Sequence, residues 1–149
     1  MTFKQKIHTH YLQLVQDRID VFKYMITALT EDSKNDAKGS AGDKHETALS
    51  MMHIEQEKLN HKLKEVLGQK AILDKIDSTT SAKTIIVGSL VKANGIYLYL
   101  STALPKIAVD GINVIALSPQ SPLGAKLMGN QEGFTFDING SNYVIQSIQ

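Results

Sequence analysis

The sequence predicts an α+β protein in which an antiparallel helical hairpin is followed by a small antiparallel sheet domain with one short helix. Up to residue 76, the apolar side chains recur at the three- and four-residue spacing of amphipathic helices. The same half carries 23 of the 31 charged side chains and all five histidines. From Lys83 onward, β-branched runs alternate with glycine-containing turns. We therefore expect a hairpin domain over residues 1–76, a linker over 77–81 and a sheet domain over 82–149.

The first helix is predicted from Phe3 to about Asp32, a stretch that contains neither proline nor glycine. Its apolar stripe, with Arg18 interrupting it, is expected to comprise Ile7, Tyr11, Leu14, Phe22, Met25 and Leu29. Residues 31–42 then lose this period and are rich in turn-forming side chains. We expect the helix to fray after Asp32.

The second helix is predicted from about Lys44 to Gln69, with its end marked by Gly68. Its apolar seam follows strict steps of three and four, through Leu49, Met52, Gln56, Leu59, Leu63 and Val66. Gln56 is the one polar position in this seam. Two such helices joined by a short polar link are expected to pack antiparallel, although helices from another chain would satisfy the same pattern.

The second half predicts strands and tight turns. Hairpin turns are expected at Asn94-Gly95 and at Asn139-Gly140. Ser121 as N-cap and Pro122 at the first helical position should open a short helix that runs through Met128 and closes at Gly129. The expected strands are Thr84–Val91, Ile96–Ser101, Val109–Leu117, Gly133–Ile138 and Tyr143–Ile148.

The composition excludes several classes of function. The chain of 149 residues has a net charge of +1, which gives no overall electrostatic reason for tight binding to nucleic acid or membrane. It has no cysteine, so a disulfide framework and a thiolate zinc site are both excluded. No apolar run approaches the roughly 20 residues of a membrane span. These features fit a cytoplasmic protein.

Two acidic residues stand where the second helix is expected to begin. Asp43 and Glu46 are three residues apart, so on a helix they are neighbours that could share one cation. Asp-x-x-Glu ahead of an apolar run is also a capping box, in which both side chains satisfy backbone N–H groups. Spacing alone leaves both interpretations open.

The order of these segments resembles a known family. The run Ser121-Pro122-Leu123-Gly124-Ala125-Lys126-Leu127-Met128-Gly129, followed by Glu132-Gly133 and a closing hairpin, resembles the FKBP-like C-terminal domain of the Gre (GreA/GreB) transcription elongation factors. The segment Gly42-Asp43-Lys44-His45-Glu46-Thr47-Ala48 is similar to the Gly-Asp-x-x-Glu-Asn-Ala motif of their coiled coil. Val87-Gly88-Ser89-Leu90-Val91 matches the family's first strand.

The resemblance implies an accessory factor that is not itself an enzyme. Such a factor binds bacterial RNA polymerase, inserts its hairpin through the secondary channel and stimulates cleavage of backtracked RNA near its 3′ end. Asp43 and Glu46 match the acids that help hold a second catalytic Mg²⁺ there, and no cofactor is expected on the protein alone. Gln120, Ser121 and Pro122 match the region that grips polymerase. A cytoplasmic monomer is expected.

Other interpretations stay open. After Glu46 the chain continues with Thr47-Ala48-Leu49-Ser50 in place of the family's usual Asn-Ala-Glu-Tyr, so a channel-entering inhibitor of polymerase is an alternative. An FKBP-like fold also raises prolyl isomerase activity, and a coiled-coil adaptor without a metal role is a third class. Lys44 and His45 could contact RNA or be solvated. The hairpin lysines Lys34, Lys38, Lys58, Lys62 and Lys64 could form a basic strip or an ordinary charged face.

Overall fold

The computed structural model describes the backbone of residues 1–39 and 43–149, with the side chains of these residues except 33, 35–39 and 43–45. The chain divides into two compact units. One comprises Gln13–Lys70, and the other comprises Met1–Leu12 together with Ala71–Gln149. The first turns of the first helix and the last turn of the second, which the sequence analysis placed in the hairpin domain, thus group with the sheet.

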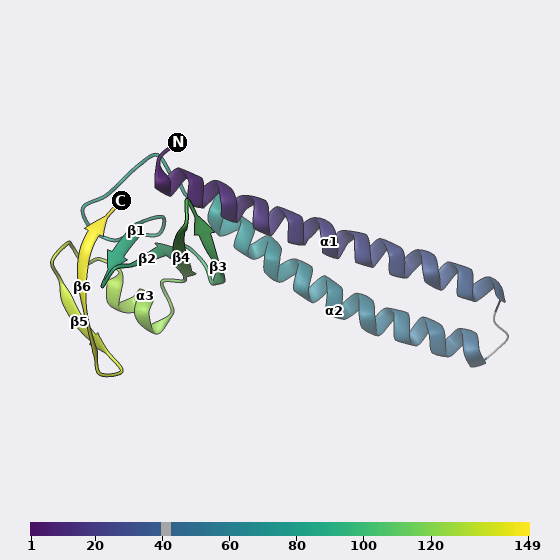
Figure 1. Cartoon of the computed structure of the whole chain (residues 1–149). Coiled ribbons are helices and arrows are strands. Elements are labelled where there is room, and N and C mark those ends of the chain that lie inside the picture. Colours follow the sequence, from purple (N-terminus) through teal and green to yellow (C-terminus); the bar gives the residue numbers. More distant parts are fainter. Residues whose placement is uncertain (40–42) are drawn as a thin grey trace. The chain divides into compact units, whose positions relative to one another are not determined.

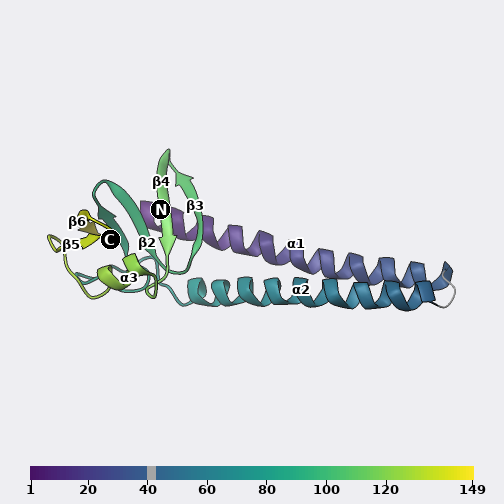
Figure 2. The same cartoon turned by 90° about the horizontal axis from the view of Figure 1, so that it is seen from below.

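The unit Gln13–Lys70 is an antiparallel helical hairpin, as predicted (Figure 1). It is built from α1, Phe3–Gly39, and α2, Asp43–Asp74, which continue into the other unit. Their 37 and 32 residues correspond to lengths of about 55 and 48 Å. Both views show the helices side by side (Figure 2).

The predicted C-terminal ends of both helices were wrong. α1 does not fray after Asp32 but continues to Gly39, because residues 31–39 contain no proline and include good helix formers. α2 passes through Gly68 and ends at Asp74. A glycine in a helix interior costs only about 1 kcal/mol, which does not end a helix whose flanking residues Val66 and Leu73 are both buried.

The apolar seam was predicted correctly on α2 and partly wrongly on α1. All six expected α2 positions are buried or half-buried. On α1, Met25 is 46% exposed, and the seam instead follows Val15, Ile19, Phe22, Ile26 and Leu29. Two apolar stripes adjoin on α1, so its own sequence cannot say which of them faces α2.

The other unit contains a six-stranded sheet with the order β3-β4-β2-β1-β6-β5. The strands are β1 Leu90–Ala93, β2 Ile96–Leu100, β3 Leu104–Val109, β4 Ile112–Leu117, β5 Thr135–Ile138 and β6 Ser141–Ile148. Neighbouring strands are antiparallel except β2 and β4, which are parallel. The sheet is therefore mixed, where the sequence predicted an antiparallel one.

Three tight turns fix the hairpins of this sheet. Asn94-Gly95 and Asn139-Gly140 have positive φ at both residues, which confirms the predicted β1–β2 and β5–β6 hairpins. Asp110-Gly111 has the same conformation and joins β3 to β4, which stand as a pair in Figure 2. The single strand predicted over Val109–Leu117 was therefore wrong, because this turn divides it and β3 precedes the turn.

The strand predicted over Thr84–Val91 was mostly wrong. Only its last two residues belong to β1, and Thr84 forms an isolated bridge with Gln131. Gly88 has φ +99, which lies outside the extended range, and it forms part of a turn. The apolar residues of this stretch therefore form a turn that enters the core at Ile85, which is fully buried.

The sheet and the short helix α3, Pro122–Leu127, enclose the core (Figure 1). Leu127 of α3 is fully buried in it. Strand residues supply most of the remainder, including Val91, Leu98, Leu100, Leu117, Phe136 and Ile145. No helix in the described part of the chain is long and apolar enough to cross a membrane.

Candidate functional site

The acidic pair predicted at the hairpin's end lies at the start of α2. The backbone is helical from Asp43 onward, so positions 43 and 46 share one face of the first turn. The side chain of Glu46 is exposed. The side chain of Asp43, like those of Lys44 and His45, lies outside the described residues. The structure therefore supports the placement of the pair and does not separate a cap from a shared cation site.

A metal site made by the protein alone would need more ligands than this pair supplies. Among the side chains that the structure describes, no three from histidine, aspartate or glutamate gather closely enough to hold a metal ion. Mg²⁺ is commonly bound by one or two carboxylates, with waters and phosphate oxygens completing its shell. A pair such as Asp43 and Glu46 has the chemistry to complete a shell that another molecule partly provides.

The segment predicted to contact a partner opens α3. Ser121 is the N-cap, as predicted: its Oγ accepts a hydrogen bond from the Gly124 N–H at 3.0 Å and donates one to the Ser118 carbonyl at 2.7 Å. Gln120 and Pro122 on either side of it are exposed. The cap holds the turn in shape, and the flanking side chains are available for contact.

Little space remains inside this turn. A Cβ atom on Gly124 would lie 2.0 Å from the Ser118 carbonyl oxygen. The Ser121 N–H also donates to that oxygen at 3.1 Å. These contacts leave the backbone from Ser118 to Gly124 one close-packed conformation, which presents Gln120 and Pro122 on a stiff support.

A buried polar cluster joins the first turns of α1 to the sheet. His8 Nδ1 lies 2.8 Å from Tyr99 Oη on β2, and the Tyr11 ring stacks on Tyr99 with centroids 6.2 Å apart. Tyr11 Oη donates to the Pro105 carbonyl at 2.9 Å. Lys4 Nζ donates to a backbone carbonyl at 2.6 Å. This cluster was not predicted, because His8 and Tyr99 are 91 residues apart and no local pattern links them.

Burial sets the protonation states in this cluster. It lowers the pKa of His8, which is only 7% exposed; Asp74 partly offsets this effect, and Lys4 adds to it. Burial also raises the pKa of Tyr11 to about 12 and raises that of Tyr99. The neutral forms of His8, Tyr11 and Tyr99 are therefore favoured at physiological pH. Through these contacts the cluster holds the first turns of α1 against the sheet.

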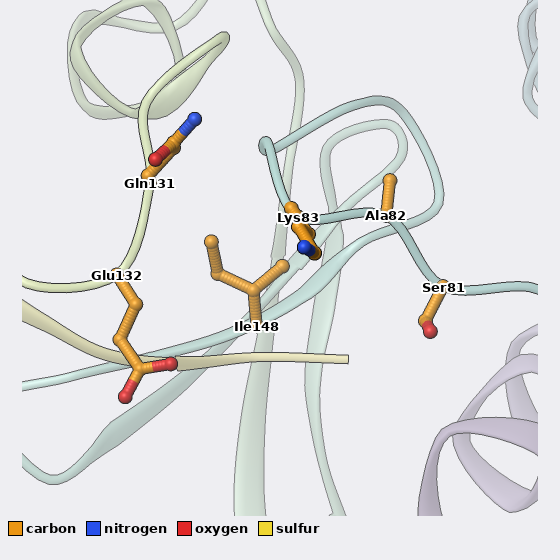
Figure 3. A pocket seen from close by; sticks show the side chains of 6 residues that line it. All are labelled: Ser81, Ala82, Lys83, Gln131, Glu132 and Ile148. Atoms are coloured by element: carbon orange, nitrogen blue, oxygen red, sulfur yellow. The ribbon is translucent and has the colours of Figure 1, made fainter.

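Each of the two units has a surface hollow. One, of about 560 Å³, is bordered by the segment Ser81, Ala82 and Lys83, by Gln131 and Glu132, and by Ile148 of β6 (Figure 3). The other, of about 350 Å³, lies on the hairpin and is bordered by Arg18, Phe22, Lys62, Glu65, Val66 and Gln69. None of the charged side chains at either hollow is buried, so neither has the built polar interior of a catalytic site.

Two lysines of the predicted basic strip pair with acids on the same helices, while the side chain of Lys38 lies outside the described residues. Lys58 pairs with Glu55 at 3.4 Å, and Lys34 pairs with Glu31 at 3.7 Å. Both pairs are exposed, so each contributes little to stability. This arrangement favours an ordinary charged helical face over a continuous basic strip.

The class of protein that this architecture defines is a long helical hairpin, with an acidic pair in the first turn of its second helix, attached to a small mixed sheet domain. Comparison of the chain with models of protein families and with curated proteins gives no match. Any functional assignment therefore depends on the motif residues and on the geometry described above.

Proposed function

We propose that this protein is a cytoplasmic, monomeric transcription factor that binds bacterial RNA polymerase and stimulates cleavage of backtracked RNA. In this proposal the hairpin enters the secondary channel, and Asp43 and Glu46 meet the polymerase active site and the nascent RNA 3′ end there. The factor is not an enzyme, because the polymerase performs the cleavage.

One observation carries the proposal: the hairpin consists of two paired helices of 37 and 32 residues, and the Asp43-x-x-Glu46 pair lies in the first turn of the second helix. A rod of this kind delivers a few side chains into a deep site that a compact domain cannot enter. Glu46 is exposed and so is available to an external ligand. The hairpin is closed by a seam of apolar residues, which makes it stiff enough for this delivery.

The chemistry of the pair suits this role. Cleavage of a phosphodiester with two metal ions requires one ion near the attacking water and one near the leaving oxygen. Mg²⁺ loses its waters reluctantly, so two carboxylates bind it weakly alone and usefully beside the acids of a polymerase. When bound there, the ion would supply the activation of water, while Asp43 and Glu46 would hold it in place.

The sheet domain supplies the docking surface in this proposal. Gln120 and Pro122 are exposed on either side of the Ser121 cap, on a turn that the Ser118 carbonyl holds in one conformation. Replacing Gln120 by alanine removes an exposed side chain without touching that turn. We expect this variant to remain folded and to bind polymerase more weakly.

A second candidate is a regulator that enters the same channel and slows synthesis without stimulating cleavage. The residues after Glu46, Thr47-Ala48-Leu49-Ser50, favour it because they depart from the pattern of cleavage factors. In this case polymerase binding and slower elongation accompany an unchanged rate of RNA cleavage.

A transcript-cleavage assay on stalled elongation complexes separates these functions. The wild-type protein should accelerate cleavage, and Asp43→Asn should lose about 100-fold, the usual effect of removing one electrostatic contact from a reaction centre. Glu57→Gln is the matched control, because it neutralises an exposed carboxylate of α2 away from the first turn. Polymerase binding should be equal for all three proteins. If Asp43→Asn cleaves as fast as the wild type, the metal role is wrong.

A further inference from the structure

A hydrogen-bonded polar pair lies in the apolar seam of the hairpin. Gln56 is the single polar residue in the seam of α2, and its side chain is half-buried there. Its Nε2 donates a hydrogen bond to Thr30 Oγ1 on α1, with the two atoms 2.8 Å apart. The contact joins residues 26 positions apart in the chain and lies within the unit Gln13–Lys70.

Thr30 is itself held in position by its own helix. Its hydroxyl donates to the Ile26 carbonyl at 3.0 Å, one turn earlier in α1. The hydroxyl proton is thus engaged, and the oxygen is left to accept from the amide of Gln56. The result is a directed chain from amide to hydroxyl to carbonyl, which requires Gln56 to lie level with Thr30.

Apolar contacts alone do not fix how far α2 lies along α1. The α1 seam, Val15, Ile19, Phe22, Ile26 and Leu29, repeats at the same steps as the α2 seam. A shift by one step of three or four residues, about 5 Å along the axis, would again bring apolar side chains together. A shift that brings Gln56 level with Ile26, one turn earlier in α1, would also leave its half-buried amide against an apolar residue, and an amide without a partner is costly.

We propose that Gln56 and Thr30 are positioning residues that fix the register of the two helices. A single polar residue has this effect in coiled coils, where it selects one alignment. The proposal rests on the proposed function in one respect: the register decides which residues form the first turn of α2, where Asp43 and Glu46 lie. The register itself is a property of the free protein.

Spin labels report the register directly. The chain has no cysteine, so Lys23→Cys and His53→Cys, both at exposed positions of the hairpin, give unique attachment sites. With Gln56 level with Thr30, these sites lie about ten residues, or about 15 Å, apart along the axis. A shift of one step therefore changes the label distance by up to about 5 Å. Pulsed electron paramagnetic resonance on the labelled, otherwise wild-type protein should give one narrow distance.

Three variants test the pair. Gln56→Leu and Thr30→Val should each give a broad or second distance, with unchanged helix content by circular dichroism. Thr30→Ser keeps the hydroxyl and should restore the narrow wild-type distance. A single unchanged distance in both Gln56→Leu and Thr30→Val would overturn the proposal. If Gln56→Leu fails to fold, the comparison of Thr30→Val with Thr30→Ser tests the proposal. If Thr30→Val fails to fold, the comparison of Gln56→Leu with wild type does so.

Failure of the register proposal is distinguishable from failure of the proposed function. The distances are measured on the free protein, without polymerase. If they respond as expected while the wild-type protein does not stimulate cleavage, the register role stands and the cleavage function fails. If they do not respond while Asp43→Asn abolishes cleavage, the reverse holds.

Discussion

Replacing Gly124 by alanine should destabilise the sheet domain, although the same substitution stabilises most helix interiors. The added Cβ would lie 2.0 Å from the Ser118 carbonyl oxygen and 2.8 Å from Ser121 Oγ. The first of these neighbours is backbone, so the turn itself must move. Overpacking of this kind costs about 1–3 kcal/mol, and loss of the Ser121 cap adds about 1 kcal/mol. Alanine regains only about 1 kcal/mol in helix propensity, which leaves a net loss of about 1–3 kcal/mol.

Gly68→Ala is the matched control for this prediction. Gly68 lies inside α2, and a Cβ there would meet nothing within 4 Å. This substitution should therefore stabilise the hairpin by up to about 1 kcal/mol. Thermal unfolding should show the opposite signs, with shifts of about 2–4 °C for each kcal/mol. The wild type has no tryptophan, so near-ultraviolet dichroism of its tyrosines and the helical signal are the probes. Equal stability of Gly124→Ala and wild type would refute the turn geometry.

Two further predictions concern the sheet domain. Burial lowers the pKa of His8, so the unfolded chain binds a proton that the folded protein excludes. The contribution of neutral His8 to stability is complete above the ordinary pKa of about 6.5 and is lost as the pH falls below it. In urea unfolding between pH 7 and 5, the free energy of unfolding should therefore fall more steeply for wild type than for His8→Gln. Equal pH dependence in the two proteins would contradict the assignment. Ser121→Ala should lower the free energy of unfolding by about 1 kcal/mol because it removes the N-cap, whereas Ser121→Thr, which keeps a hydroxyl, should stay near wild type in the same measurement.

The parts of the fold that follow from local chemistry were predictable. Ser121 and Pro122 open α3 because a hydroxyl acceptor and a fixed φ suit the first turn of a helix. Asn94-Gly95 and Asn139-Gly140 form hairpin turns because both residues tolerate positive φ. In each case the residues that decide the conformation are adjacent in the chain.

The features that the sequence did not reveal depend on distant partners. The contact between His8 and Tyr99 joins two residues 91 positions apart, and nothing near either residue indicates it. The choice between the two stripes of α1 depends on α2, which is why Met25 was expected in the seam and Ile26 lies there instead. The parallel pairing of β2 with β4 likewise follows from the order of the whole sheet.

The candidate site differs from the fold in how it can be tested. Core residues are constrained by packing, but Glu46, Gln120 and Pro122 are exposed, and substitutions at such positions usually change stability by less than about 0.5 kcal/mol. At position 43, asparagine caps a helix about as well as aspartate, so Asp43→Asn should leave unfolding unchanged even if the residue is a cap. A loss of RNA cleavage by this variant, with normal stability and polymerase binding, can therefore be attributed to the lost negative charge. If the variant has normal stability and also cleaves normally, the negative charge of Asp43 has no part in cleavage, and the residue acts as a helix cap alone.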